Sequence, residues 1–313
     1  MKVLVTGGAG FIGSNLARTL IQQGDTVIVL DDLSSGYRKN INPYLQHLQF
    51  IKGDIRDVSL LDQIIQNVEV IYHLAASVGN KRSIDNPFLD ADINVRGTLC
   101  VLEAARKHHV KKIVVTSSAG IFGELKTLPI KEDHPIEPRT PYASSKLYAE
   151  KIALSYAELY GLSSVCLRYF NVYGPNQRLD PYGNVIPIFV FKMLRTEPLV
   201  IFGDGEQTRD FVNVQDIVQA NIKAAATPGL VGAFNIASGT QITINKLVNH
   251  LMTITGLKPT IQYQPPRPGD VRHSLADITR AKEAFGYTPT VSLKNGLAEY
   301  VAWAKTESFE TVT

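Results

Sequence analysis

Tyr142 and Lys146 are the residues of this sequence best placed for acid–base chemistry. They begin and end the run Tyr-Ala-Ser-Ser-Lys, which follows Pro141 and starts a segment with helical periodicity. An i, i+4 spacing puts two side chains on one face of a helix, one turn apart. A free phenol has a pKa of about 10, and a neighbouring ammonium group favours its ionised form. The pair is therefore predicted to exchange a proton with a substrate hydroxyl group.

A glycine-rich turn near the N-terminus has the spacing of a phosphate-binding loop. Gly7, Gly10 and Gly13 lie between an apolar segment at residues 3–5, predicted as a strand, and a helical pattern over residues 12–20. Glycine permits positive φ and a close approach of the backbone to a pyrophosphate, which the N–H groups at the start of the helix can bind. The residues predicted to contact a dinucleotide here are Gly7, Gly10, Phe11, Ile12 and Gly13.

Asp31 supplies a second, independent signal for a dinucleotide. It ends the predicted strand at residues 27–30 and is followed by Asp32, which we also place at the cofactor site. A carboxylate at this point accepts from a ribose 2′-hydroxyl group and repels a 2′-phosphate. The cofactor is therefore predicted to be NAD, although Arg38 lies near enough in the sequence to leave NADP open.

Two further strand ends are expected beside the dinucleotide. Asp54 and Ile55 follow the third predicted strand and are suited to the adenine edge. Leu74, Ala75 and Ala76 end the next strand, where small side chains let the dinucleotide backbone pass closely.

Ser118 is the third candidate catalytic residue. It ends a run of three hydroxyl side chains that follows the apolar segment at residues 113–115, predicted as a strand. In a doubly wound sheet, the carboxyl ends of the strands form the edge at which ligands bind. Ser118 is therefore expected beside the nicotinamide half of the site, together with Tyr142 and Lys146.

The elements that position these residues form an α/β protein. In the first half of the chain, short apolar strands alternate with helical patterns, which predicts a Rossmann-type, doubly wound parallel sheet. After about Tyr173 turn dipeptides become frequent, so we assign residues 1–173 to an NAD-binding domain. Residues 174–313 are expected to form a smaller mixed α/β substrate-binding region, with some chain returning to the first domain. His73, inside a strand, is interpreted as a core histidine.

Composition excludes several other classes of protein. The chain has 313 residues, 44% hydrophobic and 19% charged, with 32 basic against 29 acidic residues. Neither nucleic acid nor a membrane is therefore an expected partner, and no metal site is predicted. Cys100 and Cys166 are too few for a disulfide framework and lie in apolar runs, which indicates buried, reduced thiols. With no signal-peptide pattern, a cytoplasmic location is expected.

Taken together, these motifs and the run at residues 168–174 resemble those of the extended short-chain dehydrogenase/reductase family, and within it the nucleotide-sugar 4-epimerases. The resemblance covers nearly the whole chain, because residues 203–205, 209–212 and 267–270 are similar to the family's nucleotide-diphosphate contacts. It implies NAD as cofactor, a UDP-sugar as substrate and a homodimer paired through the helical segments at residues 87–107 and 142–160.

The resemblance also implies roles for individual residues. Tyr142 removes the proton of the sugar 4-hydroxyl group while C4 passes a hydride to NAD, and Ser118 hydrogen-bonds the C4 oxygen. Lys146 holds the nicotinamide ribose and lowers the pKa of Tyr142. The 4-keto sugar then rotates, and the hydride returns to its opposite face. Further residues are implied at the cofactor (Tyr169), at the diphosphate (Asn171, Arg209 and Arg267) and at the uridine ribose (Asp270).

The residues after Ser118 favour epimerisation over related reactions. A 4,6-dehydratase needs an acid beside the serine, and a decarboxylase usually has glutamate there, but this chain has Ala119 and Gly120, with Glu124 as the next carboxylate. Ser274 stands where relatives restricted to glucose have tyrosine, which predicts that 2-N-acetyl sugars are accepted.

The resemblance leaves UDP-glucuronate as an alternative substrate, because uronate 4-epimerases of the family have an arginine in the stretch that contains Arg178, where it could pair with a C6 carboxylate. Two departures from the family pattern are Val78, in place of lysine, and Phe122, in place of tyrosine. A non-catalytic dinucleotide-binding sensor is the alternative of another class.

Overall fold

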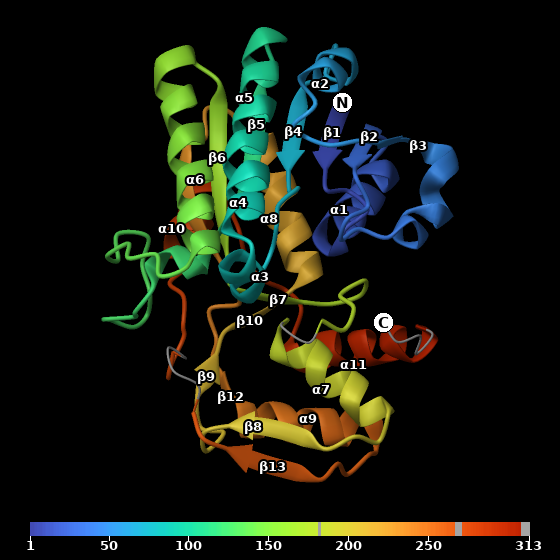
Figure 1. Ribbon diagram of the computed structural model, residues 1–313, viewed down its shortest axis with the longest axis vertical. Helices are drawn as coiled ribbons and strands as arrows, with labels where there is room; N and C mark the ends of the chain where they lie inside the picture. Colours follow the sequence, from blue (N-terminus) through green and yellow to red (C-terminus); the bar gives the residue numbers. More distant parts are fainter. Residues whose placement is uncertain (181–182, 267–270, 308–313) are drawn as a thin grey trace.

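A seven-stranded parallel sheet forms the centre of the molecule, with strand order β11-β6-β5-β4-β1-β2-β3 (Figure 1). The computed structural model describes residues 1–180, 183–266 and 271–307. The strands are β1 (Lys2–Thr6), β2 (Thr26–Asp31), β3 (Leu48–Lys52), β4 (Val70–His73), β5 (Lys112–Ser118), β6 (Ser163–Tyr169) and β11 (Gly232–Ile236). This order confirms the predicted Rossmann-type sheet. The seventh strand, β11, was not predicted and comes from the second half of the chain.

Helices cover both faces of this sheet. One face packs against α1 (Phe11–Gln22), α8 (Val214–Ala226) and α10 (Thr279–Phe285). The other packs against α2 (Val58–Ile64), α5 (Thr98–Lys107) and α6 (Pro141–Tyr160). Since successive side chains of a strand point to opposite faces, Val3 and Val5 belong to the first core and Leu4 to the second. Burial on both faces explains why the strands are almost continuously apolar.

The helical segment predicted at residues 87–107 consists of two α-helices joined by a π-helical turn. After α3 (Asn80–Asp85), the side chain of Asn86 accepts a hydrogen bond from the N–H of Leu89 and so caps α4 (Pro87–Ala91). A π-helical turn, η3 (Asp92–Gly97), then joins α4 to α5. A π turn widens the helix locally and is often found at functional sites.

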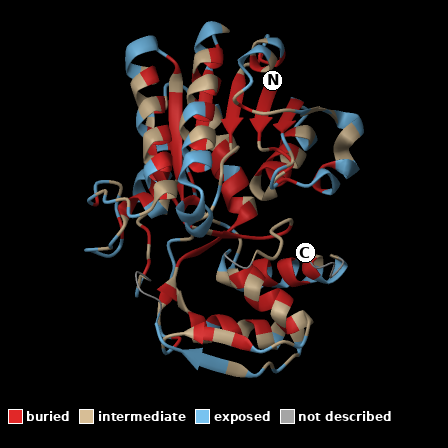
Figure 2. Ribbon diagram, in the orientation of Figure 1, coloured by how far each residue is buried: buried red, intermediate tan, exposed pale blue. Residues whose placement is uncertain are grey.

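A smaller mixed region lies beyond the carboxyl edge of the sheet (Figure 1). A buried core, visible in Figure 2 and formed mainly by the helices and the first strand, holds together three helices and two paired strands. These are α7 (Val185–Leu194), β8 (Leu199–Phe202), α9 (Ile244–Thr255), β13 (Ile261–Gln264) and α11 (Leu293–Thr306). Two short strand pairs link it to the sheet: β7 (Asn171–Tyr173) with β10 (Phe211–Asn213), and β9 (Thr208–Arg209) with β12 (Ile242–Thr243). The assignment of residues 174–313 to a substrate-binding region stays a prediction.

The remaining elements are the short 3-10 helices η1 (Arg38–Asn40), η2 (Asn42–His47) and η4 (Ala119–Phe122). Cys166 is buried as predicted, whereas Cys100 is only partly buried, and both are free thiols. Within the described ranges, no helix is both long enough and apolar enough to cross a membrane.

Candidate active site

The turn between β1 and α1 requires glycine at its first and last positions. Gly7 has φ of +69°, and a Cβ atom there would lie 2.8 Å from the N atom of Ala75, which follows β4. A Cβ atom on Gly13 would lie 2.2 Å from the carbonyl oxygen of Gly7. Gly10 precedes helix α1, which has no side-chain cap and no acidic residue in its first turn. Its first N–H groups therefore suit an anion, which is what a pyrophosphate-binding turn requires.

Asp31 ends β2 beside this turn. Its carboxylate accepts hydrogen bonds from the N–H groups of Ala9 and Leu33, both at 2.9 Å. Burial raises the pKa of Asp31, and these two backbone bonds act in the opposite direction. A carboxylate has about four acceptor positions, so Asp31 retains capacity for a ribose hydroxyl group. Arg38 places its guanidinium 5.7 Å from the ring centroid of Phe50.

Other residues expected at the cofactor have partners within the protein. Asp32 accepts hydrogen bonds from the N–H and the hydroxyl group of Ser34. Asp54 forms an ion pair with Arg56, which lowers the pKa of Asp54. The hydroxyl group of Tyr169 lies 3.0 Å from the side-chain oxygen of Asn221 on α8.

Backbone and core contacts fix the other cofactor-site residues. Ile55 packs closely on Gly97, because a Cβ atom on Gly97 would lie 2.4 Å from Cδ1 of Ile55. The N–H groups of Leu74 and Ala75 donate to the carbonyl oxygen and the hydroxyl group of Thr6, and Ala76 follows them. These contacts tie the end of β4 to the end of β1.

His73 is a core histidine, as predicted. Its two ring nitrogens lie 2.8 Å from the hydroxyl group of Thr6 and 3.0 Å from that of Thr98. The Thr98 hydroxyl group donates to the carbonyl oxygen of Asn94, so it accepts from Nε2 of His73, and Nδ1 accepts from Thr6. Burial lowers the pKa of His73 to about 3, which keeps the ring neutral.

Helix α6 brings Tyr142 and Lys146 to the carboxyl end of β5. The side chain of Thr140 caps the helix by accepting from the N–H of Ala143 at 3.2 Å, and Pro141 occupies its first position. Tyr142 hydrogen-bonds Ser118, the last residue of β5. The structure thus brings Tyr142 and Ser118 together, and Lys146 lies one turn further along the same helix.

The electrostatics of Tyr142 differ from the prediction. Burial raises the pKa of Tyr142 to about 12, and the hydrogen bond with Ser118 only partly offsets it. The lowering expected from Lys146 is absent, because the groups that affect the pKa of Tyr142 are Ser118 and Asp90. The protein's own groups therefore favour the neutral phenol, and a further positive charge beside Tyr142 is needed to ionise it at neutral pH.

Lys146 is a buried ammonium group with no direct partner among the described residues. Its exposed fraction is 4%, and burial lowers its pKa to about 8. Within residues 1–180, 183–266 and 271–307 it makes no hydrogen bond or ion pair, and Asp90 is the only carboxylate that affects its pKa. A buried ammonium group with three unused donors is costly unless a ligand satisfies it. Vicinal hydroxyl groups of a ribose fit this requirement, so the residues present fit a dinucleotide.

An amide network beside Lys146 was not predicted from the sequence. The side-chain amide of Asn94, on the π turn, donates to Ser145 at 3.0 Å and to Asp90 at 3.1 Å, and exchanges two hydrogen bonds with the backbone of Ser77. Burial raises the pKa of Asp90. This network fixes the turn after β4 against α6.

A buried ion pair was also missed. Glu150, on α6, accepts from Arg168 at 2.9 and 2.7 Å and from the hydroxyl group of Ser117 at 2.7 Å. The side chains of Arg168 and Glu150 are 4% and 0% exposed. The pair joins β5, β6 and α6 behind the catalytic residues. Phe122 is fully buried, with the Arg168 guanidinium 5.1 Å from its ring centroid, so it is a core residue.

On the substrate side, the residues are distributed over several segments. Asn171 donates to the carbonyl oxygen of Asp210 at 3.1 Å, and Arg209 donates to that of Thr208 at 2.8 Å. Ser274 is buried. Val78 is exposed.

Arg267 and Asp270, also expected at the substrate, lie outside the described residues. Arg178 pairs with a carboxylate of this chain, Glu307, at 2.9 Å.

Comparison with known proteins places this site in a family. Residues 4–300 match the family described as GDP-mannose 4,6 dehydratase. The chain belongs to this family of extended short-chain dehydrogenases/reductases. A UDP-glucose 4-epimerase from Thermotoga maritima, solved with UDP-glucose, is 41% identical, with 97% of this chain and 99% of that chain covered and a TM-score of 0.93.

Two other solved members of the family are similar over nearly the whole chain. A UDP-N-acetylglucosamine 4-epimerase from Methanobrevibacter ruminantium, in complex with UDP-N-acetylmuramic acid, is 38% identical, covers 96% of this chain and 97% of that chain, and has a TM-score of 0.93. A UDP-glucose 4-epimerase from Thermus thermophilus, in complex with NAD, is 35% identical, covers 98% and 99%, and has a TM-score of 0.88.

Proposed function

We propose that this protein is an NAD-dependent UDP-sugar 4-epimerase. The observation that carries the proposal is the Ser118–Tyr142–Lys146 set at the carboxyl edge of the sheet, with no acid beside Ser118. Ala119 and Gly120 follow it, and the next carboxylate, Glu124, is largely exposed and paired with Arg139 at 2.6 Å. Dehydration and decarboxylation therefore lack the acid group that they need, although the family is described by a dehydratase.

NAD would be held by the glycine turn, by Asp31 and by Lys146, and it would accept a hydride from the sugar C4 and return it. Ser118 and Tyr142 then orient the 4-hydroxyl group, with Tyr142 as the base. Lys146 binds the ribose, which satisfies its donors. An oxidised nicotinamide ring bound beside Tyr142 would supply the positive charge needed to ionise it.

Isomerisation also requires the sugar to turn while its nucleotide stays bound. Asn171 and Arg209, with Arg267 and Asp270, are proposed to hold the diphosphate and the uridine, since a guanidinium can bind phosphate oxygens with two donors. Ser274 leaves room for a 2-N-acetyl group. We therefore propose that both UDP-glucose and UDP-N-acetylglucosamine are substrates.

An NMR assay of several UDP-sugars tests the function directly. The purified protein is incubated, without added NAD, with UDP-glucose, UDP-N-acetylglucosamine and UDP-glucuronate, and inversion at C4 is followed. Conversion of the two neutral sugars supports the proposal. If only UDP-glucuronate is converted, the alternative substrate is correct. Should no sugar be inverted even after NAD is supplied, a non-catalytic dinucleotide-binding protein is the better description.

We also propose a homodimer. Helices α5 and α6 pack side by side on one face of the sheet (Figure 1), and Leu159 and Tyr160 at the end of α6 are exposed. A second copy can cover these helices in a four-helix arrangement. Light scattering should give twice the 34.5 kDa of one chain at micromolar concentration, and a mass of one chain would contradict the proposal.

A further inference from the structure

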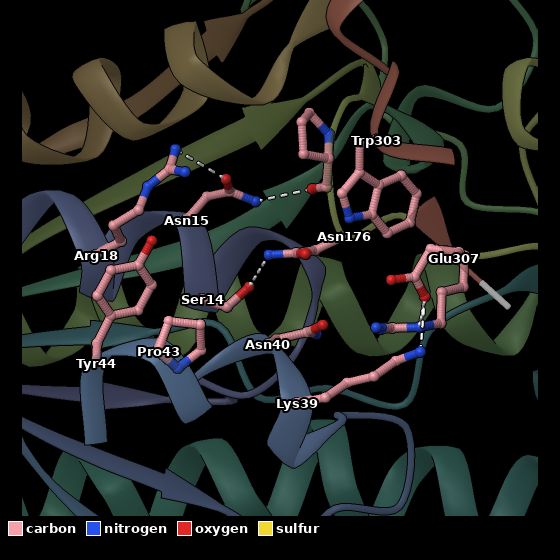
Figure 3. A pocket seen from close by; sticks show the side chains of 12 residues that line it. Ser14, Asn15, Arg18, Lys39, Asn40, Pro43, Tyr44, Asn176, Trp303 and Glu307 are labelled. Atoms are coloured by element: carbon pink, nitrogen blue, oxygen red, sulfur yellow. Dashed lines mark hydrogen bonds and ion pairs between the residues drawn. The ribbon is translucent and has the colours of Figure 1, made fainter. Parts of the chain in front are cut away.

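Residues 175–178, here named the strap, cross from the substrate region to the helix that begins the cofactor site. The side chain of Asn15 donates to the carbonyl oxygen of Pro175 at 2.9 Å, and that of Asn176 donates to Ser14 at 3.0 Å (Figure 3). Ser14 and Asn15 belong to the first turns of α1. The strap is therefore attached to the helix whose N-terminus faces the pyrophosphate.

At its other end the strap holds the segment that follows β2. The guanidinium of Arg178 lies 4.1 Å from the ring centroid of Tyr37, and its Nε donates to Glu307 at 2.9 Å. Lys39 donates to the same carboxylate oxygen at 2.7 Å. The side chains of Arg178 and Glu307 are only 15% and 14% exposed, so water screens their attraction weakly. We call Arg178, Glu307, Lys39 and Tyr37 the clamp.

The clamped segment is hydrogen-bonded to the glycine turn. The carbonyl oxygen of Ala9 accepts from the N–H of Tyr37 at 3.0 Å and from the side chain of Asn40 at 2.8 Å. The N–H of Ala9 in turn donates to Asp31. The segment at residues 37–40, the glycine turn and Asp31 thus form one connected unit. In this fold the residues after β2 flank the adenosine half of a dinucleotide.

A pocket of about 220 Å³ separates the two sides of this junction (Figure 3). One wall comes from α1, η1 and η2, and the other from the strap and the end of α11. Its lining includes Arg18, Asn40 and Tyr44 on the first side and Asn176 and Trp303 on the second. Side chains do not fill this space. The two sides are therefore joined here mainly by the clamp and by the strap's two hydrogen bonds with asparagine side chains.

We propose that Arg178 and Glu307 are positioning residues for cofactor retention. By holding residues 37–40 against the glycine turn, they keep the adenosine side of the site closed and slow the release of NAD. The inference rests on the NAD site of the proposed function, but not on the identity of the sugar. It also gives Arg178 a role that is different from binding a sugar carboxylate.

The test measures the release of bound NAD, with no sugar present. Protein loaded with NAD is diluted into an enzyme that consumes free NAD, and the bound fraction is followed by chromatography. Glu307→Gln is expected to raise the dissociation rate constant about tenfold, the equivalent of losing one charge-assisted hydrogen bond of about 1.4 kcal/mol. Glu299→Gln, which makes the same change of charge at an exposed position of α11, is the matched control and should leave the rate unchanged.

A double variant decides whether the residues act as one clamp. If they do, Arg178→Gln with Glu307→Gln releases NAD no faster than the faster single variant. If the double variant releases NAD at a rate raised by the product of the two single effects, the proposal is overturned. It is also overturned if Glu307→Gln releases NAD at the same rate as Glu299→Gln. Lys39→Gln removes the charge of a side chain that is 49% exposed, so the fold stays intact. This variant should give a smaller increase in the rate of NAD release. If the variants release NAD as expected but the parent protein inverts no UDP-sugar at C4, only the proposed function is wrong.

Discussion

The buried pair of Glu150 and Arg168 allows a quantitative prediction. Glu150→Gln keeps the shape of the side chain but removes its charge, which leaves the Arg168 guanidinium 4% exposed without a counter-ion. Removing one partner of a buried pair costs about 3–5 kcal/mol. Arg168 would keep its hydrogen bond to the carbonyl oxygen of Glu132 at 2.9 Å and its contact with the ring of Phe122. We therefore expect the lower end, a loss of about 3 kcal/mol in the free energy of unfolding.

The same substitution should slow catalysis. Ser117, which donates to Glu150, precedes Ser118, and Glu150 lies two turns after Tyr142 on α6. Without the carboxylate, β5 and α6 are less tightly joined, so kcat should fall about tenfold while KM changes little, because a small misplacement of reacting groups has a large effect on rate.

Chemical unfolding followed by circular dichroism gives the stability, and initial rates give kcat. The double variant with Arg168→Met removes the unpaired charge and should recover at least half of the lost stability. If Glu150→Gln costs less than 1 kcal/mol, or if the double variant is no more stable than Glu150→Gln, the assigned electrostatics are wrong.

Three further predictions concern the site itself. Tyr142→Phe should lower kcat at least a hundredfold and leave bound NAD unchanged by chromatography; comparable turnover would remove Tyr142 as the base. Because the pKa of Lys146 is lowered to about 8, the unfolded chain binds more protons between pH 8 and 10, so this group adds stability as pH rises through that range. Between pH 8 and 10, the free energy of unfolding of Lys146→Met should therefore rise by about 2 kcal/mol less than that of the parent. Parallel curves of unfolding free energy against pH for the two proteins would contradict this. Ser274→Tyr should lower kcat/KM for UDP-N-acetylglucosamine at least tenfold and spare UDP-glucose, and an equal loss for both would refute the size argument.

Much of the fold could be predicted because its signals are local. Six strands are short apolar runs, and the glycine turn, Asp31 and the Tyr142–Lys146 spacing each lie within one strand–helix junction. Strand β11 was missed because its sequence, Gly-Ala-Phe-Asn-Ile, has a weak strand pattern and its partner β6 lies far earlier in the chain.

The missed parts of the site depend on contacts between distant residues. Nothing near Arg178 in the sequence indicates that Glu307, 129 residues later, is its partner. Likewise, the pattern around Glu150 does not distinguish a buried carboxylate from an exposed one. For Tyr142, the spacing predicts a neighbouring cation but not the degree of burial, which dominates its pKa.

The position of β11 has a consequence for how the chain must be made. A ribosome-bound or truncated product ending near residue 173 would present β6 as an open edge strand, because its outer neighbour is β11. It would also lack α8 and α10, leaving the part of one apolar face that α1 does not cover exposed to water. Exposed edges and faces of this kind favour aggregation, so the nascent first half needs protection until residues 211–285 have emerged and docked.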